Sequence, residues 1–128
     1  MEAQKNRHQE RESAMIFLYQ ALLTAPLNST NTLDFDEIST SQFYRAIKYA
    51  LDNQTDLIEL IQDELLEWSF ERLGYVEQAI LLLACGEAVV EATPKGILIN
   101  EAVEMAKRFS DEDSYKLINA TLDRVLNI

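Results

Sequence analysis

Few residues in this chain could carry out chemistry, because it holds one histidine and one cysteine. Catalysis by a nucleophile and a base needs two such groups within hydrogen-bonding reach. Cys85 lies inside an apolar run, where a thiol behaves as a small hydrophobic side chain. His8 and Glu12 are four residues apart, close enough on a helix to share a metal ion, but the sequence has no second histidine or cysteine to complete a site. The three glycines are too scattered to form a phosphate-cradling loop. We therefore expect no enzyme, no metal site and no cofactor.

A cationic cluster at the start of the chain could instead bind nucleic acid. Arg7 and Arg11 are four residues apart and so point the same way on a helix, with Lys5 and His8 nearby. Such side chains can hold RNA phosphates by charge-assisted hydrogen bonds. The alternative is a set of ion pairs within the helix, because two glutamates lie beside these cations.

The overall charge limits any nucleic-acid site to a local patch. Eleven lysines and arginines stand against 22 acidic residues, and the resulting net charge of -11 repels phosphates. A few clustered cations can still act, because salt screens charges more than about 8 Å apart. A second, sparser basic set of Lys107, Arg108 and Lys116 is typical of a solvated helix face. Trp68, at a helix junction, is expected to be a packing anchor rather than a platform for a ligand.

Helical periodicity shows which elements must position these residues. Apolar residues spaced three and four apart predict helices around residues 14–25, 43–51, 57–65, 70–92, 98–109 and 117–125. Pro26 should end the first helix, and a polar loop should follow over residues 27–40. The segment 70–92 is apolar all round in its middle, which is typical of a central, buried helix. The expected N-caps lie among residues 39–41 for the second helix, at Thr55 for the third, and at Ser110 or Asp111 for the last.

These elements predict an all-α fold of six or seven helices. The 128 residues suit one domain, 1–128, with an N-terminal half over 1–66 and a C-terminal half over 67–128. The polar start lacks the apolar stretch of a signal peptide, and a single cysteine excludes an intramolecular disulfide. The longest apolar run, residues 79–85, is far shorter than the ~20 residues that span a bilayer. We therefore expect a cytoplasmic protein without a membrane partner.

Three segments of the sequence, in this order, carry a resemblance to a known family. The first is the arginine-bearing stretch 7–19, which ends in Leu18-Tyr19. The second is Trp68 to Leu73, followed by residues 76–84 and Glu87. The third is the most specific, since it places apolar, amide and charged residues in one order through Pro94, 99–109, 112–116, 118–119 and 122–124. Together these segments resemble the NusB family of bacterial transcription antitermination factors.

The resemblance implies two packed helical bundles and a non-enzymatic function. Such a protein binds the boxA element of ribosomal RNA transcripts together with NusE, a ribosomal protein of the small subunit. The pair joins other Nus factors on RNA polymerase, suppresses premature termination and assists ribosomal RNA maturation. The positions that match the family's RNA surface are Arg7, Arg11, Asp113, Lys116, Leu117 and Asn119. Lys5, which lies close to Arg7 in the sequence, is expected at the same surface. The positions that match the family's NusE surface are Tyr19 and Glu77.

Three departures from the family pattern affect the RNA surface. His8-Gln9-Glu10 replaces part of a run of arginines, so fewer phosphate contacts should form. Leu117 stands in place of an aromatic residue that would stack on a base, and Ala120 in place of a glycine. Two alternatives stay open. One is a protein-only adaptor that has lost RNA binding, and the other is the RNA-binding domain of a ribosomal RNA methyltransferase. The sequence also leaves open whether the chain forms a homodimer.

Overall fold

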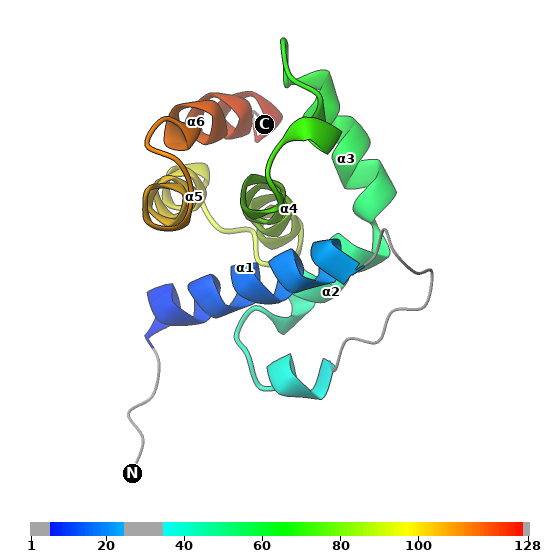
Figure 1. The fold of residues 1–128 in the computed structure, drawn as a ribbon. Coiled ribbons are helices and arrows are strands. Elements are labelled where there is room, and N and C mark those ends of the chain that lie inside the picture. The colour runs from blue at the N-terminus through cyan, green and yellow to red at the C-terminus, as the bar shows by residue number, and fades with distance from the viewer. Residues whose placement is uncertain (1–5, 25–34, 127–128) are drawn as a thin grey trace.

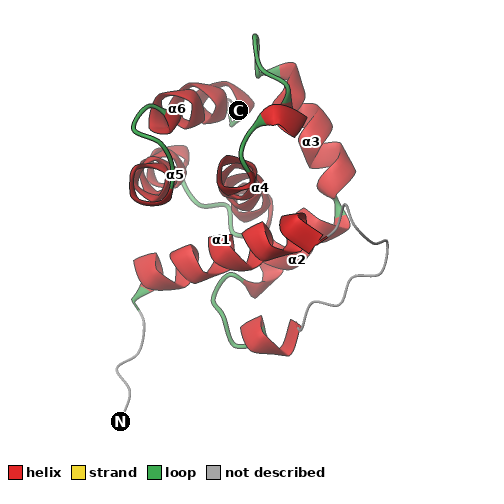
Figure 2. Ribbon diagram, in the orientation of Figure 1, coloured by secondary structure: helices red, strands yellow, loops and turns green. Residues whose placement is uncertain are grey.

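The apolar stripes of the sequence become helices in the computed structural model, which describes residues 6–24 and 35–126. Within these ranges the chain contains no strand, and the all-α prediction is confirmed (Figures 1 and 2). Two short 3-10 helices, η2 (Phe35–Ile38) and η3 (Phe70–Arg72), lie between longer elements. The six α-helices are α1 (Arg7–Thr24), α2 (Tyr44–Asp52), α3 (Gln54–Asp63), α4 (Tyr75–Val90), α5 (Lys95–Phe109) and α6 (Ser114–Val125). None of the described helices has both the length and the apolar character that crossing a membrane requires.

Helix α4 forms the centre of the fold, as its continuous apolar sequence predicts. Every residue from Gln78 to Glu87 is buried. Helices α1, α2 and α5 pack around α4, while α6 packs along α5 (Figure 1). Since α4 contacts helices from both halves of the chain, one continuous core joins the two halves.

Cys85 belongs to this core. Its side chain is buried within α4, and burial raises the pKa of the thiol to about 12. A thiol with such a pKa stays protonated and unreactive at neutral pH. The structural role expected for Cys85 therefore agrees with its surroundings.

The ends of several helices differ from the predicted ones. The central helix begins at Tyr75 and not near residue 70, because extended backbone at Leu73 and Gly74 separates it from η3. Thr55 does not cap α3, since Asn53 alone separates α2 from α3 and serves as the N-cap. Of the predicted loop 27–40, residues 35–38 form η2, while Pro26 and the residues up to 34 lie outside the described ranges.

The predicted caps of α2 and α6 are also displaced. Helix α2 has Phe43 as its N-cap, and the Ser41 hydroxyl accepts a hydrogen bond from the Phe43 amide at 3.0 Å instead of capping the helix itself. Helix α6 has Asp113 as its N-cap. Ser110 is instead the C-cap of α5, and its hydroxyl donates to the Glu77 carboxylate at 2.6 Å.

Candidate nucleic-acid and protein interface

The two arginines of α1 lie in different environments, although both were expected at an RNA surface. Arg11 is 3% exposed, and its Nε and Nη2 donate to Oε2 and Oε1 of Glu87 at 3.1 and 2.6 Å. Glu87, on α4, is itself 1% exposed, and it also accepts a hydrogen bond from the Thr93 hydroxyl at 3.0 Å. The Arg11 guanidinium therefore joins α1 to α4 inside the protein and does not face solvent.

Arg7 lies one helical turn earlier and remains accessible. Half of its side chain is exposed, and its Nη1 donates to Oε1 of Gln42 at 2.6 Å. Its guanidinium lies 4.8 Å from the ring centroid of Phe43, whose ring also contacts Arg11 at 4.7 Å. The Phe43 ring and Gln42 thus fix the direction of the Arg7 side chain while leaving donors at the surface.

Between α1 and α5, charged side chains form an ionic seam of His8, Glu12, Glu101 and Arg108. The His8 Nδ1–H donates to Oε2 of Glu101 at 2.7 Å, and its Nε2 lies 3.2 Å from Oε2 of Glu12. Arg108 approaches the same Glu12 oxygen at 3.3 Å. The hydrogen bond to Glu101 raises the pKa of His8, and the charges of Glu101 and Glu12 add to this; desolvation and Arg108 oppose it. The seam ties the start of α1 to α5.

The raised pKa of His8 predicts a pH-dependent stability. Since the pKa is higher in the folded protein than the ordinary value of 6.5, protonated His8 stabilises the fold fully below that pH. This contribution is lost as the pH rises through the folded pKa. Because 41% of the side chain is exposed, we expect well under ~1 kcal/mol.

Urea denaturation of the wild type and of His8→Asn, at about pH 5.5 and about pH 8.5, measures the effect. The difference between the two proteins should be larger at the lower pH. An equal difference at both values would contradict the bridging role of protonated His8.

Exposed cations lie on α1, α5 and α6. Arg108 is paired with Glu12 of α1 but keeps 64% of its side chain exposed. The neighbouring Lys107 lies over the Tyr115 ring of α6, with 4.9 Å between its ammonium and the ring centroid. On α6, Lys116 is 67% exposed and 3.5 Å from Asp113. We call Arg7, Lys107, Arg108 and Lys116 the cationic strip.

Helix α5 connects the two parts of this strip, because it lies between α1 and α6 (Figure 1). The sequence predicts Lys107 and Arg108 as part of a solvated helix face and not as site residues. Their place in the last turn of α5 was visible in the sequence, but the contacts to α1 and α6 were not. Asn119 is exposed on α6, whereas Lys5 lies outside the described residues.

Beside α6, the structure brings three expected site residues together around one hollow, the Trp68 hollow. Glu77, Asp113 and Leu117 line it, and its volume is about 490 Å³. The other lining residues are Trp68, Arg72, Leu73, Gly74, Asp111 and Ser114. Trp68 is 56% exposed, so the prediction that it is a packing anchor is wrong: Phe70 and Leu73 are the residues of this segment whose side chains enter the core.

Tyr19, the other residue expected at the NusE surface, lies on α1 and does not line this hollow. It is half-buried and packs against the core. Ile16 and Leu23, three residues before and four after it, are each 40% exposed. These three residues give α1 an apolar outer stripe. Their helical spacing is visible in the sequence, but of the three only Tyr19 was expected at the NusE surface.

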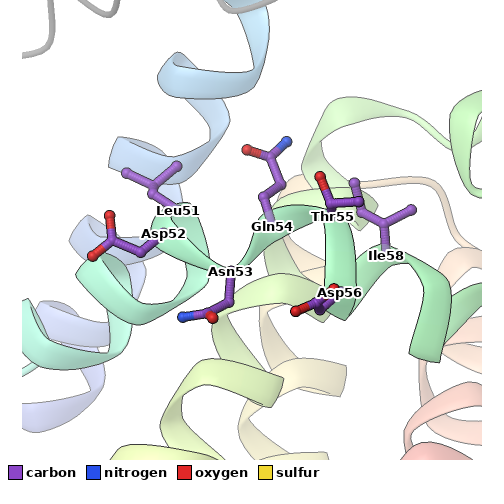
Figure 3. A pocket seen from close by; sticks show the side chains of 7 residues that line it. All are labelled: Leu51, Asp52, Asn53, Gln54, Thr55, Asp56 and Ile58. Atoms are coloured by element: carbon purple, nitrogen blue, oxygen red, sulfur yellow. The ribbon is translucent and has the colours of Figure 1, made fainter.

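A second hollow, of about 440 Å³, lies where α2 meets α3. Its side chains do not converge: Gln54 and Asn53 point to opposite sides of the chain, and Asp52 points away from Asp56 (Figure 3). Asp52 is already paired with Lys48 at 3.5 Å. Among the described residues no group of three or more histidine, cysteine or acidic side chains could hold a metal ion.

Comparison with known proteins places this arrangement in a family. The model of the NusB family matches residues 8–127. The transcription antitermination protein NusB of Exiguobacterium sp. is 36% identical over 124 residues, which cover 94% of this chain and 96% of that protein. The protein of the same name from Cyanothece sp. is 40% identical over 80 residues, 62% of this chain and 38% of its own length.

Solved structures agree with the sequence matches. T. maritima NusB superimposes with a TM-score of 0.80 at 28% identity, covering 98% of this chain and 93% of that one. A structure described as the antitermination factors NusB and NusE in complex with double-stranded RNA matches with a TM-score of 0.72 over 94% of this chain and 96% of that one. At 21% identity, this second match supports the fold alone. On the family model and the full-length relative, this chain belongs to the NusB family.

Proposed function

We propose that this chain is a transcription antitermination protein that binds boxA RNA together with NusE and works with other Nus factors on RNA polymerase. Its relatives carry the name of that activity, and a protein of the same fold is described in complex with NusE and RNA. The observation that carries the proposal is a family match over residues 8–127 in a chain with four exposed cations on three adjoining helices.

The cationic strip is the proposed RNA surface. Its four side chains are exposed, and charge-assisted hydrogen bonds to phosphates would position the RNA without reading its sequence. Asn119 and Asp113 add hydrogen-bonding groups at the α6 end. Arg11 is not one of the proposed RNA-contacting residues, because its buried guanidinium is hydrogen-bonded to Glu87. The role of Arg11 is to hold α1 against α4.

The proposed NusE surface combines the apolar outer stripe of α1 with Glu77. Exposed apolar side chains in a row are typical of protein interfaces, and Glu77 adds a charge that can set the orientation of a partner. Two partial surfaces that share one RNA bind it more tightly than either does alone. The RNA affinity of this acidic chain should therefore depend on NusE.

Removing cations from the strip tests the RNA surface. Arg7→Ala and Lys116→Ala should each weaken boxA RNA binding roughly three- to tenfold and reduce the slope of log affinity against log salt by about 0.7, the value for one phosphate of a single strand. Lys48→Gln removes a cation outside the strip and serves as the control. Fluorescence anisotropy with labelled RNA, at several salt concentrations and with NusE present, measures both quantities.

The same assay distinguishes the proposed RNA-binding function from that of a protein-only adaptor. That alternative is favoured by the ion pairs which Arg108 and Lys116 already make with Glu12 and Asp113. If NusE binds normally while neither substitution changes RNA binding, the chain is an adaptor. If NusE does not increase RNA affinity, the proposed cooperation between the two surfaces is refuted.

A further inference from the structure

The Trp68 hollow contains an aromatic surface that the protein's own packing does not use. Trp68 and Arg72 come from the segment between α3 and α4, and Leu117 comes from α6 on the other side. Burial of an indole is strongly favourable, so a 56% exposed tryptophan beside apolar residues marks a surface suited to a ligand or partner. Its volume of about 490 Å³ lies within the about 300–1,000 Å³ typical of small-molecule sites.

The backbone that carries Trp68 is held in place. The side-chain amide of Gln62 donates to the Trp68 carbonyl at 2.8 Å and accepts from the Phe70 amide at 2.7 Å. The Trp68 amide also donates to the Leu65 carbonyl at 2.7 Å. Because these bonds fix the backbone on both sides of Trp68, the fold holds this residue at the rim of the hollow.

The charged side chains that line the hollow are one arginine and three carboxylates, and two of the carboxylates already have a partner. Glu77 accepts a hydrogen bond from Ser110 at 2.6 Å, and Asp113 is paired with Lys116 at 3.5 Å. The side chains of Arg72 and Asp111 have no ion-pair or hydrogen-bond partner among the described residues. The hollow therefore offers one cation as a donor and one carboxylate as an acceptor beside an aromatic face.

We propose that this hollow binds one unpaired nucleobase of the RNA, stacked on the indole of Trp68. A nucleobase is planar and neutral and has donors and acceptors on its edge, so it suits both Arg72 and Asp111. A phosphate alone would be opposed by the three carboxylates. The hollow also adjoins Lys116 at the end of the cationic strip. This inference rests on the proposed RNA-binding function.

Affinity for boxA RNA in the presence of NusE tests the stacking. Trp68→Ala should weaken binding roughly 5- to 100-fold, the range for loss of one base–aromatic stack, while Trp68→Phe should keep most of the affinity. Leu66→Ala is the matched control, since Leu66 is in the same loop and 75% exposed but does not line the hollow. Arg72→Gln should weaken binding more than Arg45→Gln, which removes an exposed arginine that pairs with Glu91.

Abasic RNA identifies the stacked base. When each nucleotide is replaced in turn by an abasic one, a single position should weaken binding to the wild type, and that loss should disappear in Trp68→Ala. Because Trp68 is the one tryptophan of the chain, its fluorescence should also be quenched when boxA RNA binds, and not when an RNA that is abasic at that position binds.

Two results would overturn the inference. The first is a Trp68→Ala variant that binds boxA RNA within twofold of the wild type. The second is an equal loss of affinity for NusE in the absence of RNA, which would make the hollow part of the protein interface. Failure of the wild type to bind boxA RNA with NusE would instead refute the proposed function, so the two failures are distinguishable.

Discussion

Replacing Glu87 by alanine should lower the free energy of unfolding by about 3–5 kcal/mol, as expected when one partner of a buried ion pair is removed. Glu87 accepts two hydrogen bonds from Arg11 and one from Thr93. Without its carboxylate, the Arg11 guanidinium stays buried with Glu101, at 3.3 Å, as its remaining anionic partner. Urea denaturation followed by far-UV circular dichroism measures the loss.

Two further variants make the test specific. Arg7→Ala removes a half-exposed cation that lies 3.9 Å from Glu87, and it should cost less than about 1 kcal/mol. The double substitution Arg11→Met with Glu87→Leu removes both charges together and should recover much of the stability lost in Glu87→Ala. A loss of less than about 1 kcal/mol in Glu87→Ala would mean that the pair does not stabilise the contact between α1 and α4.

This ion pair changes how arginine substitutions in α1 must be interpreted. Removing Arg11 alone leaves the Glu87 carboxylate buried without this partner and destabilises the packing of α1 on α4, so RNA binding would weaken even if Arg11 never touches RNA. A variant lacking Arg7 keeps that contact. Comparing unfolding and RNA binding for each arginine separately therefore distinguishes a positioning residue from a contact residue.

The helices were predictable because their signal is local. Apolar residues three and four apart identified all six, and the continuous apolar middle of α4 identified the central helix. The helix ends were less predictable. The start of α4 depends on the extended backbone at Leu73 and Gly74, and the Ser110 hydroxyl has Glu77 as its partner. Such competing partners are far away in the sequence.

The candidate site was predictable only in part, for the same reason. Sequence analysis placed Arg7 and Arg11 on one face of a helix, but it could not show which of them meets Glu87, 76 residues beyond Arg11. Likewise, Trp68 and Leu117 line one hollow although they lie far apart in the sequence. The resemblance supplied Glu77, Asp113 and Leu117 as separate positions; their common hollow is a property of the fold.

Gly86→Ala should destabilise the protein by about 1–3 kcal/mol, although alanine is the better helix former. A β-carbon at Gly86 would lie 2.6 Å from the backbone oxygen of Ala46 and 3.5 Å from the β-carbon of Ala50. Backbone cannot give way as a flexible side chain can, so α2 and α4 must move apart. Gly86 precedes Glu87 in α4, and the same movement would disturb the buried ion pair with Arg11.

Gly96→Ala is the matched control because a β-carbon there meets no atom within 4 Å. Gly96 lies in the first turn of α5, and alanine should stabilise the protein by about 0.4–1 kcal/mol by restricting the unfolded chain. The two substitutions add the same methyl group to a helix, so opposite changes in the urea midpoint isolate the contact between α2 and α4. If Gly86→Ala instead stabilises the protein as much as Gly96→Ala, these helices do not pack as closely as the structure shows, and the placement of Glu87 against α1 loses its support.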